Sequence, residues 1–267
     1  MTTIGVIGMG AMGAAIAARL VENGATVLTE LGGRSEATVN RAKAAGVEIT
    51  GDRDIAARSE IILSVIPPSS AGDVAGHYRE LITANGGKAM FIDINAIAPQ
   101  TMQEIAEPYL SAGLPVADGS IIGGPPKKGT AGPRIYLSGN LGNSAETLKT
   151  CGLDIRVLSE NIGDASALKM SYAGITKGMQ ALSSAMAIGA ARQGALDSLV
   201  EELKFSQGPL YAFMCQYIPG MYAKAYRWDG EMREIARFLE PEAGSVGMLS
   251  GAADLYVELT VNTGKGY

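Results

Sequence analysis

Histidine and cysteine are scarce in this chain of 267 residues, which contains one histidine, His77, and two cysteines, Cys151 and Cys215. A serine–histidine triad or a histidine-based metal site is hard to build with a single histidine. We expect His77 on a helix surface, and we predict no metal site. The two cysteines lie far apart and lack the spacing of metal ligands, so we interpret both as reduced core thiols.

Long apolar runs and an excess of basic residues are also missing. No stretch of about eighteen consecutive apolar residues occurs, and the N-terminus passes into an expected strand without the basic start of a signal peptide. The net charge of -5 disfavours a nucleic-acid surface, which requires clustered lysines and arginines. We therefore expect a cytoplasmic protein with neither a membrane nor a nucleic acid as partner.

The most informative stretch that is present runs from Thr3 to Leu20 and reads TIGVIGMGAMGAAIAARL. A β-branched run leads into glycines spaced G-x-G-x-x-G, and an alanine-rich helical pattern follows at once, which is the context of a dinucleotide fingerprint. Gly8 permits the tight turn, Gly10 admits a pyrophosphate to the backbone, and Gly13 lets the helix sit close on the sheet. Because helix-start amides face phosphates, the predicted cofactor contacts are Gly8, Met9, Gly10, Ala11, Met12 and Gly13.

The segment after an expected second strand at residues 25–29 predicts which form of the cofactor is bound. An acid at this point binds the ribose hydroxyls of NAD, whereas an arginine beside a hydroxyl suits the extra phosphate of NADP. The chain has both, as Glu30 and as the neighbours Arg34 and Ser35. Arg34 follows a Gly-Gly turn that lets it reach a phosphate, so we predict NADP, with NAD as the alternative. The competing interpretation of Arg34 is a solvated loop charge.

Strand and helix patterns alternate up to about residue 160 and predict a doubly wound parallel sheet of the α/β class. Further strands are expected at residues 47–49, 60–66, 89–94, 116–118 and 134–138, and helices at residues 35–45, 54–58, 71–82 and 99–112. The apolar run at 60–66 ends at a proline, where strand-end loops face the cofactor. Val65, Ile66 and Pro67 are therefore predicted to wall the nicotinamide ribose.

Residues 118–124, with the sequence DGSIIGG, form a glycine-rich segment shortly before Lys127 and Lys128. We expect a loop at a strand end whose unhindered amides hold a carboxylate or phosphate, with the lysines adding positive charge. The alternative is a flexible surface hairpin that carries solubilising lysines.

A long helical pattern begins near Asp164, and the chain beyond Gly194 is predicted to be wholly helical. The later helices are expected at residues 197–205, 209–217, 221–226, 229–239 and 242–256, separated by glycine and proline breaks at residues 208–209, 219–220 and 240–241. We therefore predict a dinucleotide-binding domain of residues 1–161 and a smaller all-α domain of residues 162–267.

Two stripes run along the long helix. One is apolar and consists of Leu168, Tyr172, Ile175, Met179, Leu182 and Met186. The adjacent stripe contains Lys169, Ala173 and Thr176. A lysine in the first turns of a helix interacts unfavourably with the helix dipole, so its presence there favours a functional role for Lys169. The alternative interpretation is an ordinary surface charge whose aliphatic stem is buried.

Three motifs in order resemble a β-hydroxyacid dehydrogenase of the 6-phosphogluconate dehydrogenase superfamily. They are GMGAMG at residues 8–13, the segment 118–124, and GDASALK at residues 163–169. The C-terminal sequence RWDGEMREI at residues 227–235 is similar to an uncharacterised branch of that superfamily. The resemblance spans nearly the whole chain and implies a Rossmann domain, a long linking helix, a small helical domain and a homodimer.

The same resemblance implies a chemistry. Lys169 would be the general acid or base in hydride transfer between a nicotinamide and a hydroxy acid, sugar acid or related carbonyl. The amides of Gly123 and Gly124 would hold the carboxylate of that small-molecule substrate. An imine reductase is one alternative, although such enzymes usually lack the lysine, and a non-catalytic protein that senses NADPH is another.

Two positions depart from the family pattern. The serine expected just before the glycine pair is Ile122, and the asparagine expected four residues after the lysine is Ala173. Both departures remove a hydrogen-bonding group and leave an apolar wall. We expect Ser120, Thr176 or Lys177 to supply replacement polar groups in the substrate site.

Overall fold

The computed structural model describes residues 2–126, 129–130 and 132–262. The chain divides into two compact units, Met1–Lys169 and Met170–Tyr267. This division falls inside the long helix α7 (Asp164–Arg192), a few residues after the boundary expected at 161/162.

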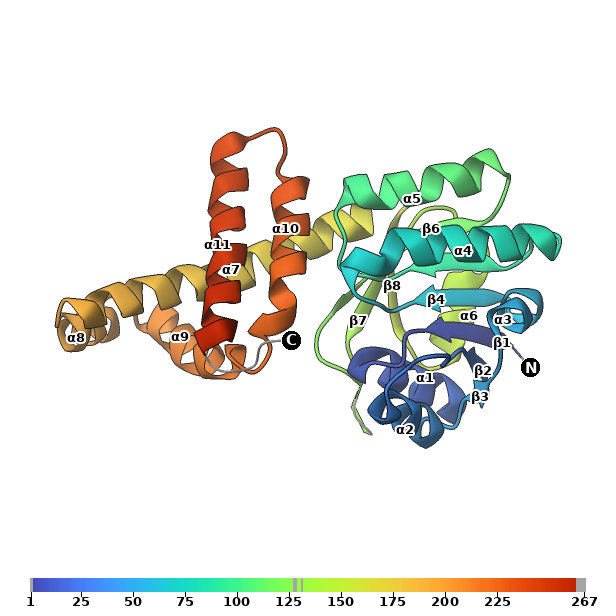
Figure 1. Ribbon diagram of the computed structural model, residues 1–267, viewed down its shortest axis with the longest axis horizontal. Helices are drawn as coiled ribbons and strands as arrows, with labels where there is room; N and C mark the ends of the chain where they lie inside the picture. The colour runs from blue at the N-terminus through green and yellow to red at the C-terminus, as the bar shows by residue number, and fades with distance from the viewer. Residues whose placement is uncertain (1, 127–128, 131, 263–267) are drawn as a thin grey trace. The chain divides into compact units, whose positions relative to one another are not determined.

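The described residues of the first unit form a sheet of eight strands in the order β3-β2-β1-β4-β5-β6-β7-β8 (Figure 1). Neighbouring strands are parallel except β6 and β7, which are antiparallel. The strands are β1 (Thr3–Ile7), β2 (Thr26–Thr29), β3 (Glu48–Ile49), β4 (Ile61–Ser64), β5 (Met90–Asp93), β6 (Val116–Ile122), β7 (Arg134–Ser138) and β8 (Asp154–Ser159). An order of 3-2-1-4-5-6 is that of a doubly wound dinucleotide-binding sheet, so the predicted Rossmann domain is confirmed.

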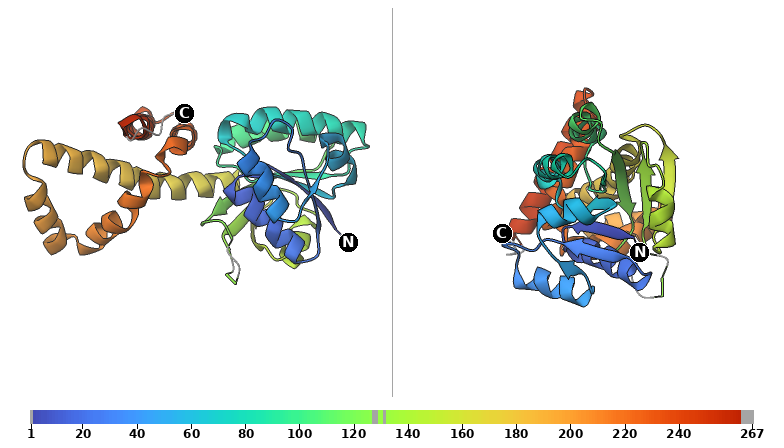
Figure 2. Two further views of the ribbon diagram at one scale, coloured as in Figure 1. Left: turned by 60° about the horizontal axis from the view of Figure 1, so that its bottom comes forward. Right: turned by 90° about the vertical axis from the view of Figure 1, so that its right-hand side faces the viewer.

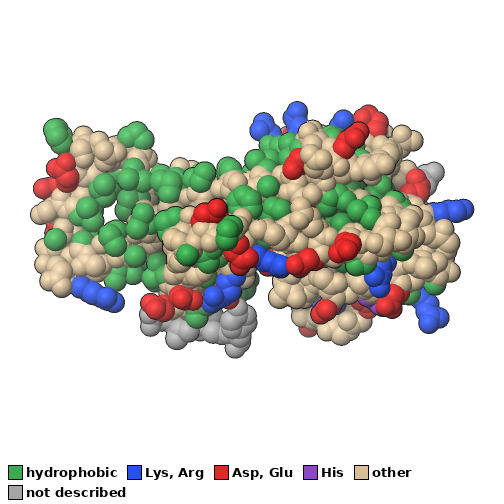
Figure 3. Space-filling model, turned by 90° about the horizontal axis from the view of Figure 1, so that it is seen from above, with side chains coloured by type: hydrophobic (Ala, Val, Ile, Leu, Met, Phe, Trp, Pro, Cys, Tyr) green, Lys and Arg blue, Asp and Glu red, His purple; other side chains and the backbone are tan. Residues whose placement is uncertain are grey.

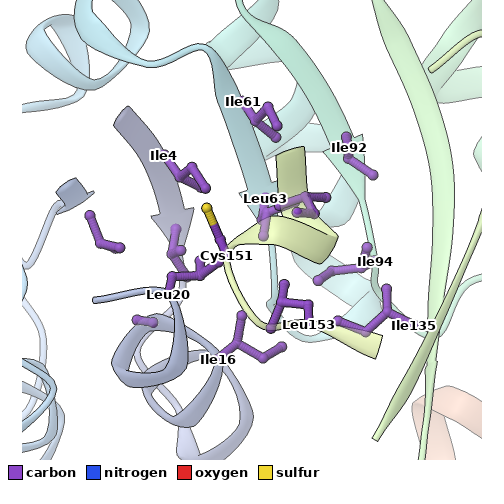
Figure 4. Packing of buried hydrophobic residues seen from close by; sticks show 14 of the residues in the cluster. Ile4, Ile16, Leu20, Ile61, Leu63, Ile92, Ile94, Ile135, Cys151 and Leu153 are labelled. Carbon is purple, nitrogen blue, oxygen red and sulfur yellow. The ribbon is translucent and has the colours of Figure 1, made fainter. Parts of the chain in front are cut away.

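Helices cover both faces of this sheet (Figure 2). One face carries α1 (Ala11–Glu22), α2 (Glu36–Ala44) and α6 (Ser144–Thr150), and the other carries α3 (Asp52–Arg58), the 3-10 turn η1 (Pro68–Ser70), α4 (Ala71–Ala84) and α5 (Pro99–Ser111). Figure 4 shows the first core, in which Ile16 and Leu20 of α1 lie against sheet residues such as Ile4 and Leu63. Burial on both faces explains why β1, β4 and β5 are nearly continuous apolar runs.

Strand β6 corrects the expected loop at residues 118–124. The strand was expected to end at Asp118, but it continues to Ile122 and pairs with β7 from Asp118 to Ile122. Gly119 lies inside the strand and not in a loop, and it allows close packing there, because a Cβ on it would lie 2.5 Å from Cγ2 of Ile94. The glycine loop therefore begins at Gly123. Helix α6 and strand β8 were not predicted.

The second unit is helical, as expected, with α8 (Leu196–Ser206), α9 (Gly208–Met221), the 3-10 turn η2 (Ala225–Arg227), α10 (Trp228–Phe238) and α11 (Ala243–Asn262) following α7. The break expected at residues 219–220 is wrong, because α9 continues through Pro219 to Met221, where few helical hydrogen bonds remain to be lost. The helix expected at residues 221–226 is replaced by η2.

The segment at residues 227–235 anchors α10 in this second unit. Lys177 of α7 forms an ion pair with Glu231, and its Nζ lies 4.9 Å from the centre of the Trp228 ring. The Tyr256 hydroxyl donates a hydrogen bond to the Lys177 carbonyl (2.6 Å), and the rings of Trp228 and Tyr256 meet edge to face at 5.2 Å. The role of this motif in the described chain is thus to join α7, α10 and α11.

The scarce residues lie mostly where we expected them. His77 is on the exposed side of α4, with Nε2 3.0 Å from Oδ2 of Asp52. Cys151 is a buried free thiol, but Cys215 is exposed, so the core prediction is wrong for Cys215. Its helix, α9, buries only Met221 among its described residues. In the described part of the chain, no helix has the length and apolarity to span a membrane, and no cluster of three potential ligand side chains could hold a metal.

Candidate functional site

The fingerprint turn between β1 and α1 needs two of its glycines for packing. Gly8 has a φ of +99°, and a Cβ on it would lie 2.3 Å from the Val65 carbonyl oxygen. A Cβ on Gly13 would lie 1.9 Å from the Gly8 carbonyl oxygen. Neither position can accept a side chain, so the turn and the first turns of α1 pack directly on the residues that follow β4.

Gly10 is different, because it faces open space. It is exposed, and no described atom lies within 4 Å of the position that its Cβ would take. Gly10 also precedes α1 as its N-cap, and among the described residues no side chain caps this helix. Exposed amides at a helix start beside open space fit the pyrophosphate of a dinucleotide. Ala11 is exposed as well, whereas Met9 is buried and Met12 is half-buried. Met9 and Met12 can therefore offer mainly backbone groups to a cofactor.

The segment Val65 to Pro67 lies beside this turn, which brings two predicted groups of cofactor residues together. The Val65 amide donates to the Ile7 carbonyl (2.8 Å), and the Ile66 side chain lies 2.8 Å from the Cβ position of Gly8. Val65 and Ile66 are half-buried and Pro67 is exposed. The segment therefore presents an apolar wall at the carboxyl end of β4.

Asn95 fixes that wall and was missed from the sequence. Its Oδ1 accepts a hydrogen bond from the Ile66 amide (2.6 Å), and its Nδ2 donates to Oγ of Ser64 (2.9 Å) and to Oδ2 of Asp93 (2.8 Å). Asp93 is fully buried, and this burial raises the pKa of Asp93 to about 7. The signal that could have revealed the cluster is the run FIDIN, in which two polar residues interrupt an otherwise apolar run at a strand end.

Asp93 should make the stability of the fold fall as pH rises. Between its ordinary pKa of 3.8 and about 7, the carboxyl ionises in the unfolded chain but stays protonated in the fold. At ~1.4 kcal/mol per pKa unit, this lowers the free energy of unfolding by up to about 4 kcal/mol across that window. Chemical denaturation at pH 4.5 and pH 8 measures the effect. The stability of Asp93→Asn relative to wild type should rise between the two pH values, and an unchanged difference would contradict the account.

The predicted adenosine-binding residues follow β2. The Glu30 carboxylate accepts a hydrogen bond from the Gly32 amide, and Arg34 is exposed. Ser35 caps α2, with its Oγ accepting from the Thr38 amide (3.4 Å). The turn after β2 thus presents a cation and a hydroxyl beside a helix start.

Arg41 ties this region to the fingerprint turn and was not selected from the sequence. Its Nε donates to the Met9 carbonyl (3.0 Å), and its Nη2 donates to Oγ1 of Thr38 (2.9 Å). Thr38 Oγ1 is also 3.1 Å from Oγ of Ser35. This contact could not be predicted from sequence spacing, because it depends on how α2 packs beside the turn between β1 and α1.

The first unit brings Lys169 to the end of β6. Its Nζ donates a hydrogen bond to the Ile121 carbonyl (3.0 Å), and its side chain is partly buried. The chain then passes through half-buried Ile122 to Gly123 and Gly124, which are both exposed. Gly123 has a φ of +125°, and no described atom lies within 4 Å of the Cβ position of Gly124. The ammonium group of Lys169 therefore contacts the strand end that leads directly into the accessible backbone of Gly123 and Gly124.

The other predicted substrate residues are placed differently. Ser120 is fully buried on β6, and its Oγ has no hydrogen-bond partner among the described residues. Ala173 and Thr176 belong to the second unit and follow Lys169 along α7. Ala173 is buried, and the Thr176 hydroxyl donates to the Tyr172 carbonyl (2.9 Å). Lys177 is held by Glu231, and Lys127 and Lys128 lie outside the described residues.

The comparisons with known proteins agree with this geometry. Residues 3–151, more than half of the chain, match the family described as the NAD binding domain of 6-phosphogluconate dehydrogenase. The chain belongs to this family. Within the family, it is similar to a protein of Methanothermus fervidus described as an uncharacterized 28.5 kDa protein in the 7S RNA 5' region. The two are 30% identical over 238 residues, which cover 88% of this chain and 90% of the relative. Residues 190–259 match a domain of unknown function, DUF1932.

Solved structures extend the likeness to the whole chain. A conserved protein of unknown function, MTH1747, described as structurally similar to 3-hydroxyacid dehydrogenases, is 27% identical with a TM-score of 0.73, and the match covers 99% of both chains. The 3-hydroxyisobutyrate dehydrogenase of Mycobacterium tuberculosis is 19% identical with a TM-score of 0.73, covering 98% of this chain and 94% of its own. The imine reductase of Myxococcus stipitatus with NADP+ is 19% identical with a TM-score of 0.58, covering 99% and 95%.

Together these findings identify the cofactor-binding domain and the fold of this family member. It has an NAD(P)-binding domain within a fold like that of the 3-hydroxyacid dehydrogenases.

Proposed function

We propose that this chain is an NADP-dependent oxidoreductase that uses Lys169 as general acid or base on a hydroxy acid, sugar acid or related carbonyl. The observation that carries the proposal is the contact between Nζ of Lys169 and the Ile121 carbonyl (3.0 Å), which sets the amine beside the glycine loop that follows β6. When bound, the cofactor supplies or accepts the hydride.

Each group of residues has a distinct part in this proposal. Gly8 to Gly13 and the first amides of α1 hold the pyrophosphate, and Val65, Ile66 and Pro67 wall the ribose. The amides of Gly123 and Gly124 orient a substrate carboxylate. The amine form of Lys169 takes the hydroxyl proton during oxidation, and the ammonium form returns it during reduction. Ser120 and Ile122 of β6 complete the part of the proposed substrate site that belongs to the first unit.

Imine reduction is the second candidate, and the apolar character of two positions favours it. Ile122 and Ala173 offer no hydrogen-bonding side chain, and Ala173 is buried. Imine reductases also share the fold. Measuring NADP(H)-dependent turnover on hydroxy acids and on cyclic imines distinguishes the two, because the presence of Lys169 predicts faster turnover of the hydroxy acids.

Preference for NADP over NAD should depend on Arg34. Replacing Arg34 with alanine removes a guanidinium that would hold the 2'-phosphate, so the Kd for NADPH should rise by about 10- to 100-fold. The Kd for NADH should stay nearly constant. Lys43→Ala, which removes another exposed cation from α2, is the matched control. Titrations followed by nucleotide fluorescence provide both constants, and equal weakening of NADPH and NADH would remove the reason for choosing NADP.

We also propose a homodimer formed through the second unit. The predicted apolar stripe of α7 is exposed in the single chain, with 64% of Ile175, 62% of Leu182 and 57% of Met186 accessible. Ile175, Met179 and Leu182 of this stripe help to line a groove of about 790 Å³, whose other lining residues are mainly apolar and come from α7, α10 and α11. Figure 3 shows many apolar side chains on the surface of this unit. Because such faces are normally covered, light scattering should give a mass of twice the 27.6 kDa chain, and a monomer would contradict the proposal.

A further inference from the structure

The first turn of α7 is attached to β6 through one buried carboxylate. Oδ2 of Asp118 accepts hydrogen bonds from the amides of Gly163 (3.0 Å) and Ser166 (3.0 Å), and Oδ1 accepts from the Ser166 hydroxyl (2.7 Å). Asp118 is fully buried. Burial raises the pKa of Asp118, while the hydrogen bonds from Ser166, Ser138 and Gly163 act in the opposite direction.

Ser138 of β7 completes the attachment. Its hydroxyl donates to Oδ2 of Asp118 (3.0 Å) and accepts from the Ala165 amide (3.0 Å). The first amides of a helix have no partner within the helix, so these contacts cap α7 from two neighbouring strands. Asp118 and Ser138 face each other in the antiparallel register of β6 and β7, which fixes the cap in the sheet.

Lys169 lies one helical turn beyond Ser166, and its ammonium group returns to the same strand. Asp118 holds the start of the helix, and the Ile121 carbonyl receives Nζ of Lys169 (3.0 Å). Two residues of β6, Gly119 and Ser120, lie between the two residues that make these contacts. Strand β6 therefore fixes both the first turn of α7, through Asp118, and the position of the Lys169 amine, through the Ile121 carbonyl.

We propose that Asp118 is a positioning residue for Lys169, which it places by fixing the first turn of α7 on β6 through hydrogen bonds shared with Ser138 and Ser166. The role assigned to Lys169 in catalysis rests on the proposed function, but the placement of its amine does not. The two statements can therefore fail separately.

The test is the reactivity of the Lys169 amine, which needs no substrate. Purified full-length chain is trace-labelled with acetic anhydride over a range of pH, and mass spectrometry gives the rate and the apparent pKa for each lysine. In Ser138→Ala and Asp118→Ala, the Lys169 amine loses its contact with the Ile121 carbonyl. Its labelling rate should rise about three- to tenfold, the equivalent of one net hydrogen bond. Asp118→Asn keeps an oxygen for the Gly163 and Ser166 amides, so it should remain close to wild type.

Matched controls separate positioning from other effects. Asp164→Asn removes a charge from the same helix end but from an exposed residue that contacts Ser159 instead of β6, so Lys169 labelling should not change. The melting temperature and the labelling of Lys149 report the state of the whole fold. If Asp118→Ala does not fold, Ser138→Ala and Ser166→Ala provide the same readout.

Two results would overturn the proposal. The first is wild-type labelling of Lys169 in folded Asp118→Ala or Ser138→Ala. The second is a Lys169 response in Asp118→Asn as large as that in Asp118→Ala, which would assign the effect to charge and not to position. Lys169 could be labelled faster in Asp118→Ala and Ser138→Ala while the wild-type chain turns over no hydroxy acid or imine. That result would support the positioning role and contradict the proposed function.

Discussion

Replacing Lys169 with alanine should lower kcat by about 10²- to 10⁴-fold on the hydroxy acid that the wild-type chain oxidises fastest. The physical reason is that hydride transfer leaves a proton on the substrate oxygen that must be taken up, and the amine beside the Ile121 carbonyl is the group that we assign to this transfer. NADPH should bind the variant with nearly unchanged Kd, because the fingerprint turn is untouched. Initial rates of NADPH formation and binding titrations give the two quantities.

Lys149→Ala is the control for this experiment. Lys149 lies in α6 of the same unit and pairs with Glu146 at 3.4 Å on the surface. Its loss should leave kcat unchanged. Full activity of Lys169→Ala would remove the lysine from the chemistry and favour another acid or base.

Replacing Gly10 with alanine should weaken NADPH binding by at least about tenfold without destabilising the fold. The backbone of Gly10 has φ −67° and ψ −173°, which alanine adopts, and the space around its Cβ position is open. Such a substitution stabilises the chain slightly, by about 0.4–1 kcal/mol, because the unfolded state loses freedom. The added methyl group would instead occupy the place where a pyrophosphate meets the backbone.

Two other glycines make this prediction specific. Gly13→Ala should lower the melting temperature, because its Cβ would lie 1.9 Å from the Gly8 carbonyl oxygen. Gly189 lies at an open helical position of α7. Gly189→Ala should therefore not lower the melting temperature, and it should leave the Kd for NADPH unchanged. Unchanged NADPH affinity in Gly10→Ala would mean that the turn does not hold the cofactor.

The sequence predicted the first unit well where local chemistry decides structure. The G-x-G-x-x-G spacing predicted a turn whose Gly8 and Gly13 are required by packing. Apolar runs of strand length identified β1, β4 and β5, because burial on both faces leaves no place for polar residues.

The contacts that build the site could not be predicted in this way. Asn95 reaches Ile66, Arg41 reaches Met9, and Asp118 reaches Ser166 across 29, 32 and 48 residues of sequence. Each contact depends on which strands become neighbours. Gly119 misled the strand assignment because a glycine that allows close packing and a glycine that begins a turn have the same sequence signature.

A crystal structure of the chain with NADP+ tests the central claim most directly. We predict the pyrophosphate on the amides of Gly10 and Ala11, the 2'-phosphate beside Arg34 and Ser35, and Nζ of Lys169 directed toward the nicotinamide. A nucleotide bound elsewhere, or a Lys169 side chain turned away from the nicotinamide, would contradict the account.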